Sequence, residues 1–516
     1  MENFINKHAN NILGFLSGFD RMIFRGCIRE FMWEGGMVAY LNANRILLKD
    51  FGNHSTKQTA KIKAVIESNV AAQNRPFIYL LSNAGSKEKM AQDILEKDKI
   101  EEGLVCAFSV LEPCYSYKVL GNHATQKLEI KSRQTKCLHI YQYWNHPLYG
   151  LIHGRIQTWY PYNIQFYING REFLKRQMDF KNISYRKADN AFLWISDLDK
   201  ANKLAQKQVV FNWQKTFDDF ALQVNPLLTE SLPKGTNYYW TLAQSEWATD
   251  ILFKDQKALE NIYPDLVHYS MKTFNSPDVM KFLGKKLTIE NWINGNFTGE
   301  VISDYKDRPE GCRVKHSVKS NSVKIYDKAG SVLRVETTIN RPQEFKSYRP
   351  KLSTGDMAWQ PMRKSIDDIS RRAEVSDNIN KKYLTALASA NTERKFTSIV
   401  DAISEPITKN GYRVRGIDPF VKDRDILDII INGKFHINGF RNRDIRKDLF
   451  GCQGIEQSKK DSAKVSRRLR ILRTHGLIKK VTKTHRYMMT DRGIELISAL
   501  KTIESTPVDT LLKMAA

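Results

Sequence analysis

The side chains best suited to chemistry lie between residues 297 and 340, where basic, acidic and phenolic residues alternate with apolar ones. Turn-forming sequences divide this region into four short segments, which predicts a meander of antiparallel strands. Successive side chains of a strand point to opposite faces of its sheet. One predicted face is apolar and carries Val314, Val323, Ile325, Leu333 and Val335. The other face carries four cations, a phenol, a carboxylate and a hydroxyl, from Arg313, Lys315, Lys324, Arg334, Tyr326, Glu336 and Thr338. We expect this second face to meet a polyanion.

A phenol beside a carboxylate and several cations is a combination that could cut a phosphodiester. Attack by tyrosine needs a metal ion or a guanidinium to offset the charge that develops on the phosphate, and a way to activate a phenol whose ordinary pKa is about 10. The residues that we assign to these roles are Tyr326 as nucleophile, Arg334 and Lys315 as charge-offsetting groups, and Glu336 with Asp304 or Asp327 as ligands of Mg²⁺ or Mn²⁺. Alternative nucleophiles are Tyr160, Tyr162 and Tyr305.

This region also resembles a known family. The run Tyr326-Asp327-Lys328, followed by Leu333-Arg334-Val335-Glu336, is similar to the YDK…LRxE pattern of rolling-circle replication initiators of filamentous phages and small plasmids. The resemblance implies a sheet that holds a divalent metal and a tyrosine that forms a 5′-phosphotyrosyl link to DNA. It further implies that Glu336 is a metal ligand and that Arg334 and Lys328 bind phosphate. The chain departs from the family pattern at the paired histidines, because His153 is followed by Arg155 and Gln157.

Near the C-terminus, residues 421–502 carry the ordered pattern of a winged helix-turn-helix. Two short helices are predicted first, then a basic helix over 458–474 with Val465, Leu469 and Leu472 on one stripe, a hairpin and a closing helix. This part resembles the DNA-binding domains of MarR-like bacterial regulators. In a duplex complex the third helix would enter the major groove and the hairpin would reach phosphate or the minor groove. The expected contacts are Lys464, Arg467, Arg468, Arg470 and Arg473 on the helix, and Lys483, His485 and Arg486 on the hairpin.

A third candidate surface is the predicted strand LIHGRIQTW. His153, Arg155 and Gln157 are two residues apart and share one face, while Ile152 and Ile156 share the other. Beside Trp159, Tyr160 and Tyr162, such a polar row could hold a phosphodiester and stack bases.

The composition favours nucleic acid as the partner. The chain has 516 residues, with 81 basic and 56 acidic side chains and a formal net charge of +25, which is more than the C-terminal segment alone would carry. The six cysteines show no CxxC spacing, and no glycine-rich phosphate loop follows the first buried strand, so neither a zinc site nor a nucleotide cofactor is expected. With no apolar run long enough to cross a bilayer and no signal-peptide pattern, we expect a cytoplasmic protein.

These patterns together predict a multidomain α+β protein. Residues 76–83, 86–100 and 103–113 are expected to form a βαβ unit with a parallel pair of strands. Residues 238–253 are expected to form a helix on which Glu246 and Asp250 share one face, and Asp20 and Arg21 interrupt an apolar stretch near the N-terminus. The expected divisions are an α/β domain over 1–130, an α+β domain with the nucleic-acid-facing sheet over 131–345, a linker and helical spacer over 346–420, the winged helix over 421–502 and a tail over 503–516. The spacer is either a simple connection or a homodimer contact. The whole chain also resembles a broad group of bacterial proteins whose distribution implies mobile elements, and a transposase-like role.

The sequence supports three hypotheses for the function. The first is a DNA-processing protein of a mobile element that finds a site and nicks it. The second is a non-catalytic, MarR-like transcriptional regulator. The third is a binding protein for a structured RNA, because winged helices also bind RNA.

Overall fold

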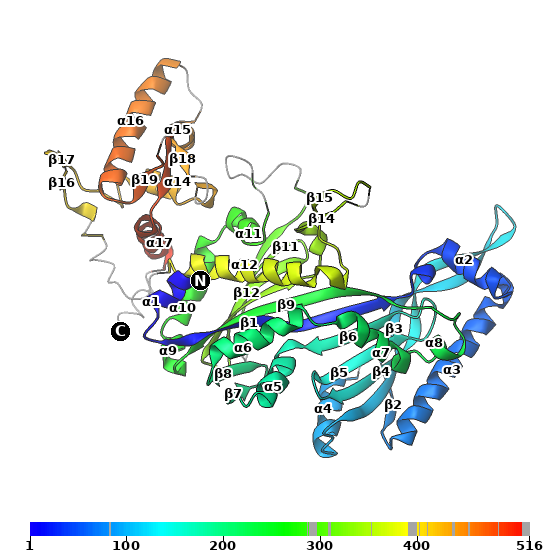
Figure 1. Ribbon diagram of the computed structural model, residues 1–516. Helices are drawn as coiled ribbons and strands as arrows, with labels where there is room; N and C mark the ends of the chain where they lie inside the picture. Colours follow the sequence, from blue (N-terminus) through cyan, green and yellow to red (C-terminus); the bar gives the residue numbers. More distant parts are fainter. Residues whose placement is uncertain are drawn as a thin grey trace. The chain divides into compact units, whose positions relative to one another are not determined.

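The computed structural model describes residues 1–516 except 82–83, 286, 288–296, 308–310, 352, 391–399, 402, 410, 436–438, 452–454, 483 and 508–516 (Figure 1). It has the expected mixed α+β architecture. The chain forms two compact units that are interleaved in sequence. Unit 1 contains Met1–Phe15, Asp250–Thr337 and Asn378–Ala516, and unit 2 contains Leu16–Thr249 and Thr338–Asp377. Each unit is therefore assembled from segments that lie far apart in the chain.

The sheet of unit 2 runs in the order β9-β1-β6-β5-β4-β3-β2. All of its neighbours with a described register are antiparallel except β2 and β3, which are parallel. The helix α4 (Lys87–Lys97) connects these two, so the βαβ unit predicted from the sequence is confirmed. The strands of this sheet are β1 (Ile12–Cys27), β2 (Phe77–Leu80), β3 (Gly103–Asn122), β4 (Lys127–His146), β5 (Gly150–Gln157), β6 (Ile164–Asn169) and β9 (Tyr239–Phe253).

Helices supply the other half of the core in unit 2. The helix α3 (Phe51–Ala72) buries Ile62, Ile66 and Val70, which are four residues apart and therefore form one stripe. The further elements are α2 (Glu34–Ala43), α5 (Gly170–Phe180), β7 (Tyr185–Ala188), β8 (Ala191–Ile195), α6 (Leu198–Gln206), α7 (Trp213–Val224), α8 (Leu227–Glu230), β14 (Lys346–Pro350), β15 (Met357–Pro361) and the first part of α12 (Ile369–Leu387). The connection expected at 346–362 thus contains a β-hairpin.

One sequence expectation about this region was wrong. Residues 238–253 were expected to be helical, but Tyr239–Phe253 is the strand β9. Its residues from 245 to 253 are all buried, so the segment lacks the alternation of apolar and polar side chains that identifies a half-buried strand. Glu246 and Asp250 still share one face, because a spacing of four suits the two-residue repeat of a strand as well.

Unit 1 contains the predicted meander. The order is β10-β11-β12-β13-β9, with Val314 opposite Ile325 and Lys315 opposite Lys324 across the antiparallel β11 and β12. The five residues of the predicted apolar face are fully buried. The elements are α1 (Glu2–Lys7), α9 (Gln256–Glu260), α10 (Tyr263–Thr273), α11 (Ser276–Phe282), β10 (Val301–Lys306), β11 (Arg313–Val318), β12 (Asn321–Lys328) and β13 (Val332–Ile339).

The C-terminal part of unit 1 has its own apolar core. Val465, Leu469 and Leu472 lie in it, as their spacing predicts. Its three-stranded sheet has the order β18-β20-β19. The elements, in chain order, are β16 (Ile407–Lys409), β17 (Tyr412–Val414), α14 (Arg424–Ile430), β18 (Phe440–Arg441), α15 (Asn442–Phe450), α16 (Ile455–Thr474), β19 (Ile478–Lys480), β20 (Arg486–Met489) and α17 (Asp491–Ser505). No helix in the described ranges is both long and apolar enough to span a membrane.

Candidate nucleic-acid interface

The helix α16 presents cations on the sides that do not face the core. Three apolar residues form its buried stripe. The helix ends where Gly476 takes a left-handed conformation with φ of 74°, which favours glycine at this position. Its exposed basic side chains are Lys459, Lys460, Lys464, Arg467, Arg470 and Arg473. This arrangement anchors the helix while leaving ammonium and guanidinium groups open to a ligand.

Contacts within unit 1 separate these cations into two groups. Lys464 lies 3.1 Å from a carboxylate oxygen of Asp461, and the guanidinium of Arg470 lies 6.0 Å from the ring of Tyr412. The other group is Lys459, Lys460, Arg467 and Arg473, which have no ion pair or side-chain hydrogen bond within the described part of the chain. This second group is the one most available to phosphates and bases.

Arg468 belongs to the fold rather than to this open surface. Its Nη1 donates to Oδ2 of Asp425 at 2.8 Å, and its Nη2 donates to the carbonyl oxygen of Lys422 at 2.8 Å. Nε lies 3.7 Å from Oδ1 of Asp423. The hydrogen bonds from Arg468 lower the pKa of Asp425. The expectation that Arg468 contacts DNA is therefore the weakest of those made for α16, because its guanidinium is occupied in joining α16 to α14.

The hairpin of β19 and β20 carries a second set of basic side chains. Lys479 and Lys480 are exposed on β19, and His485 is exposed before β20 begins. Arg486 is half-buried and pairs in register with Arg441 of β18. Lys483, which we expected at the tip, lies outside the described residues. The two exposed lysines were not among the contacts expected from the sequence, although their place next to the hairpin turn is the signal that would have found them.

The predicted polar face of the meander brings Tyr326 and Glu336 together. The Tyr326 hydroxyl donates to Oε2 of Glu336 at 2.7 Å, and Nζ of Lys324 lies 2.6 Å from Oε1. Burial by itself raises the pKa of Glu336, but attraction to Lys324 and Arg334 outweighs burial and holds the pKa below its usual value. An ionised carboxylate thus accepts a hydrogen bond from a half-buried phenol, which is the geometry of a base beside a nucleophile.

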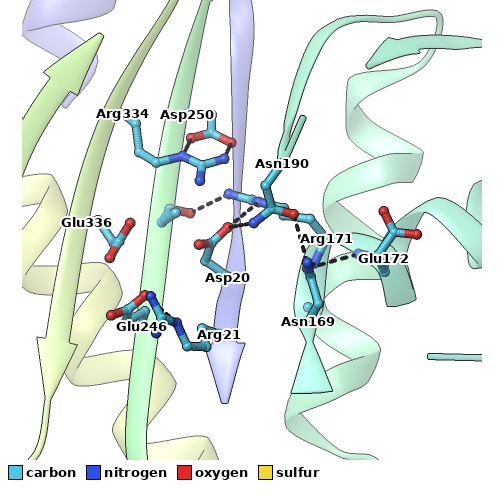
Figure 2. A network of polar contacts seen from close by, with 12 residues as sticks. Asp20, Arg21, Asn169, Arg171, Glu172, Asn190, Glu246, Asp250, Arg334 and Glu336 are labelled. Carbon is cyan, nitrogen blue, oxygen red and sulfur yellow. Dashed lines mark hydrogen bonds and ion pairs between the residues drawn. The ribbon is translucent and has the colours of Figure 1, made fainter. Parts of the chain in front are cut away.

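Two other expectations for this face need correction. Arg334 is buried and donates from Nε and Nη2 to the two carboxylate oxygens of Asp250, at 2.6 and 2.9 Å, so its guanidinium is not open to a phosphate (Figure 2). Asp327 points to the opposite face from Tyr326 because neighbours in a strand alternate, and its Oδ1 accepts a hydrogen bond from the Gly330 amide at 3.0 Å. It is therefore not a fellow ligand of Glu336.

The other residues expected on this sheet lie on β10, β11 and β12. Asp304 of β10 pairs in register with Lys315 of β11, and Arg313 pairs with Tyr326 of β12. Lys328 ends β12 on the same side as Tyr326. The described acidic residues that could hold a metal ion include Glu336 but neither Asp304 nor Asp327.

Two buried acidic residues of unit 2, Asp20 and Glu246, could contribute ligands to a metal ion. In unit 2, carboxylate oxygens of Asp20 and Glu246 lie within 4.8 Å of each other (Figure 2). Each already has a basic partner, because Arg171 lies 3.6 Å from Asp20 and Arg21 lies 3.2 Å from Glu246. A divalent cation would therefore compete with these guanidiniums. Asp20 and Arg21 interrupt an apolar stretch of the sequence, but nothing in that stretch indicates that they lie near Glu246.

The surroundings of Asp20 are built by hydrogen bonds within unit 2. Nδ2 of Asn190 donates to Oδ1 of Asp20 at 2.8 Å, and Nδ2 of Asn169 donates to Oδ1 of Asn190 at 3.0 Å. Nη2 of the fully buried Arg171 donates to the carbonyl oxygen of Ala248 at 3.1 Å (Figure 2). These contacts hold the carboxylate in one position on β1.

The polar row on β5 is not an open surface. His153 stacks on Tyr167 with ring centroids 5.5 Å apart, and burial lowers its pKa to about 4. Arg155 lies 3.4 Å from Glu112, and the buried Gln157 donates to the carbonyl oxygen of Tyr115 at 3.1 Å. Of the aromatic residues expected to stack bases, Tyr160 and Tyr162 are fully buried and Trp159 is half-buried. The predicted faces are right, because Ile152 and Ile156 are in the core, but contacts within unit 2 occupy the side chains of the polar face.

Comparison with protein-family models, with curated proteins and with solved structures finds no match to this chain.

Proposed function

We propose that this protein binds duplex DNA through residues 424–505, folded as a winged helix-turn-helix of the MarR-like kind, with α16 as the recognition helix. Its proposed setting is a mobile genetic element in a bacterial cytoplasm. The observation that carries the proposal is the division of α16 into a buried apolar stripe and an exposed basic surface. The order of elements from α14 to α17 and the sheet β18-β20-β19 support it. In such a module α16 enters the major groove and the hairpin approaches the backbone.

The exposed basic side chains suggest which residues would contact bases and which would contact phosphates. Arg467 lies near the middle of α16 and has the guanidinium geometry that reads guanine through two hydrogen bonds. Lys459, Lys460, Lys479 and Lys480 would contact phosphates, which carry no sequence information but contribute most of the affinity. Binding should therefore weaken steeply as salt rises.

The proposal is tested by titrating the full chain with a labelled duplex selected from a random pool, and with a scrambled duplex of equal length. Arg467→Ala should bind the selected duplex less tightly and lose its preference over the scrambled one. The matched control is Arg492→Ala on α17, an exposed arginine away from α16, which should bind like the parent chain. Equal affinity of parent and Arg467→Ala for both duplexes would contradict the proposal, and tighter binding of a structured RNA at equal salt would favour the RNA reading.

A second candidate function is cleavage of a DNA strand by Tyr326, and the hydrogen bond of 2.7 Å from its phenol to Glu336 is the observation that favours it. In this reaction the Tyr326 oxygen would form a bond to phosphorus as the phenol proton passes to Glu336. The bond from phosphorus to the 3′ oxygen would break, and that oxygen would take the proton back from Glu336. The products would be a 5′-phosphotyrosyl link and a free 3′ hydroxyl.

Cleavage is tested with end-labelled single- and double-stranded DNA on denaturing gels, with and without Mg²⁺ or Mn²⁺. Label retained on the protein, and lost in Tyr326→Phe, would support it. Tyr79→Phe is the matched control, because Tyr79 is an exposed phenol on β2, outside the meander. DNA that is bound but intact under every condition leaves a non-catalytic regulator.

A further inference from the structure

The hairpin of β14 and β15 carries an exposed pair of aromatic rings. Tyr348 and Trp359 lie opposite each other in register, with ring centroids 5.4 Å apart, and are 54% and 55% exposed. Met357, next along the same face, is also exposed. We propose that this hairpin is a binding site for single-stranded nucleic acid, whose unpaired bases stack on Tyr348 and Trp359. This goes beyond the duplex contacts proposed for α16, and uses no residue of that surface.

The two faces of the hairpin differ sharply in their environment. Ser347, on the opposite face from the rings, is buried and its hydroxyl donates to Oδ1 of Asp368 at 3.4 Å. On that same face, Nε2 of Gln360 donates to the carbonyl oxygen of Arg349 at 3.1 Å. The inward face is thus hydrogen-bonded to unit 2 through Ser347. The face that carries the large apolar side chains is exposed instead. Large exposed apolar groups gathered in one place mark an interaction site.

The ring pair is held in position before any ligand arrives. Arg371 of α12 donates from Nε to the carbonyl oxygen of Lys346 at 2.9 Å, and its guanidinium lies 5.1 Å from the centre of the Trp359 ring. Nη1 of the same arginine lies 2.7 Å from Glu374. One side chain therefore connects the helix, the β14 backbone and the indole. A ligand that stacks on a fixed ring loses less entropy than one that must order it.

Charge favours a nucleic acid over a neutral ligand. Between 346 and 361 the chain has three basic residues and one acidic residue. Lys346, Lys351 and the following Lys364 are exposed and have no ion pair within the described ranges. Aromatic rings that stack bases, beside cations that follow the phosphates, are the combination found in proteins that bind single strands. Bases in a duplex are already stacked on each other, so the rings select unpaired ones.

The test uses the full chain and fluorescently labelled oligonucleotides of dT, measured by anisotropy at constant salt. Trp359→Ala and Tyr348→Ala should each weaken binding about 5-fold to 100-fold, the range for loss of one stacked base. Trp359→Phe, which keeps a ring, should retain most of the affinity. The matched control is Trp33→Ala, because Trp33 is 63% exposed in the same unit, and it should bind like the parent chain.

A second arm separates stacking from attraction to phosphate. An abasic oligonucleotide of the same length keeps the phosphates but has no bases, so it should bind more weakly than dT and show no change with Trp359→Ala. Equal binding of the two oligonucleotides, or equal losses in Trp359→Ala and Trp33→Ala, would overturn the proposal. Duplex affinity measured in parallel should fall with Arg467→Ala and not with Trp359→Ala, so failure of one proposal is distinguishable from failure of the other.

Discussion

Arg334 and Asp250 face each other in the core of unit 1 and share two parallel hydrogen bonds, of 2.6 and 2.9 Å. Both side chains are almost fully excluded from solvent. Charges are placed in such an environment at a large cost in desolvation, which only a partner of opposite charge and good geometry offsets. The pair joins β13 to β9, and its two residues lie 84 positions apart in the sequence.

We expect Arg334→Met to lower the free energy of unfolding by about 3–5 kcal/mol, because it removes one member of a buried ion pair while the buried Asp250 carboxylate stays. Urea unfolding followed by circular dichroism would measure the loss. The double variant Arg334→Met with Asp250→Leu removes both charges and should recover much of it. A double variant that is as unstable as the sum of the two single variants would show that the pair contributes through packing alone.

Arg467 and Arg468 are adjacent on α16, but replacing one or the other by alanine should affect different properties of the protein. Arg467→Ala removes an exposed guanidinium without an internal partner, so stability should be unchanged while duplex affinity falls by about 1–3 kcal/mol. Arg468→Ala removes the contacts to Asp425 and Lys422, so we expect a loss of about 1 kcal/mol in stability. Thermal unfolding and anisotropy titration of both variants would separate the two effects. An Arg468→Ala variant of full stability would contradict the structural role.

His316 should make stability depend on pH. Its ring nitrogens lie 2.8 Å from Oγ of Ser303 and 3.0 Å from Oγ of Ser270, and burial lowers its pKa from the ordinary 6.5 to about 4. The unfolded chain binds a proton below about pH 6.5 that the folded chain does not. This part of the stability is therefore intact above pH 6.5 and falls by up to about 1.4 kcal/mol per pH unit between pH 6.5 and 4. Unfolding of His316→Gln over this range should show a shallower slope than the parent.

Gly26 of β1 lies against the indole ring of Trp240, and the absence of a side chain at this position leaves room for that ring. A Cβ atom at this position would lie 2.4 Å from Cζ3 of Trp240, a fully buried residue whose Nε1 donates to Asp218 at 2.8 Å and cannot move aside. Gly26→Ala should destabilise the protein by about 1–3 kcal/mol through overpacking. Gly121→Ala is the matched control, because no atom lies within 4 Å of its added methyl group. Equal stability of the two variants would contradict this packing argument.

Local pattern predicted much of the secondary structure. The alternation of Val314 with Arg313 and Lys315, and the helical spacing of Val465, Leu469 and Leu472, were sufficient to assign faces that the structure bears out. These assignments succeed because burial on one side imposes a period on the sequence. The strand β9 was mistaken for a helix because both of its faces are covered and no period remains.

The candidate sites were predicted less well, because they depend on contacts between distant segments. Nothing near Arg334 in the sequence signals that Asp250 occupies its guanidinium, and nothing near Arg468 signals Asp425. The same holds for Asp20 and Glu246, which lie on β1 and β9. Tyr348 and Trp359 were not predicted as a site for another reason. The segment that contains them has two prolines and a glycine, and this composition is typical of a connection. Only its fold as a hairpin places the two rings opposite each other.

The interleaving of the two units has a consequence for synthesis on the ribosome. Lys7 donates from Nζ to the carbonyl oxygen of Ala388 at 3.1 Å, and Asn11 accepts from the Lys254 amide at 2.9 Å, so the earliest residues of unit 1 bond to segments translated hundreds of residues later. Unit 2 has all of its residues once 377 has left the exit tunnel, whereas unit 1 must wait for residues beyond it. The nascent chain therefore completes unit 2 before unit 1. Until the last residues are made, the existing part of unit 1 lacks the segments that complete it. Chaperones would matter most at this stage.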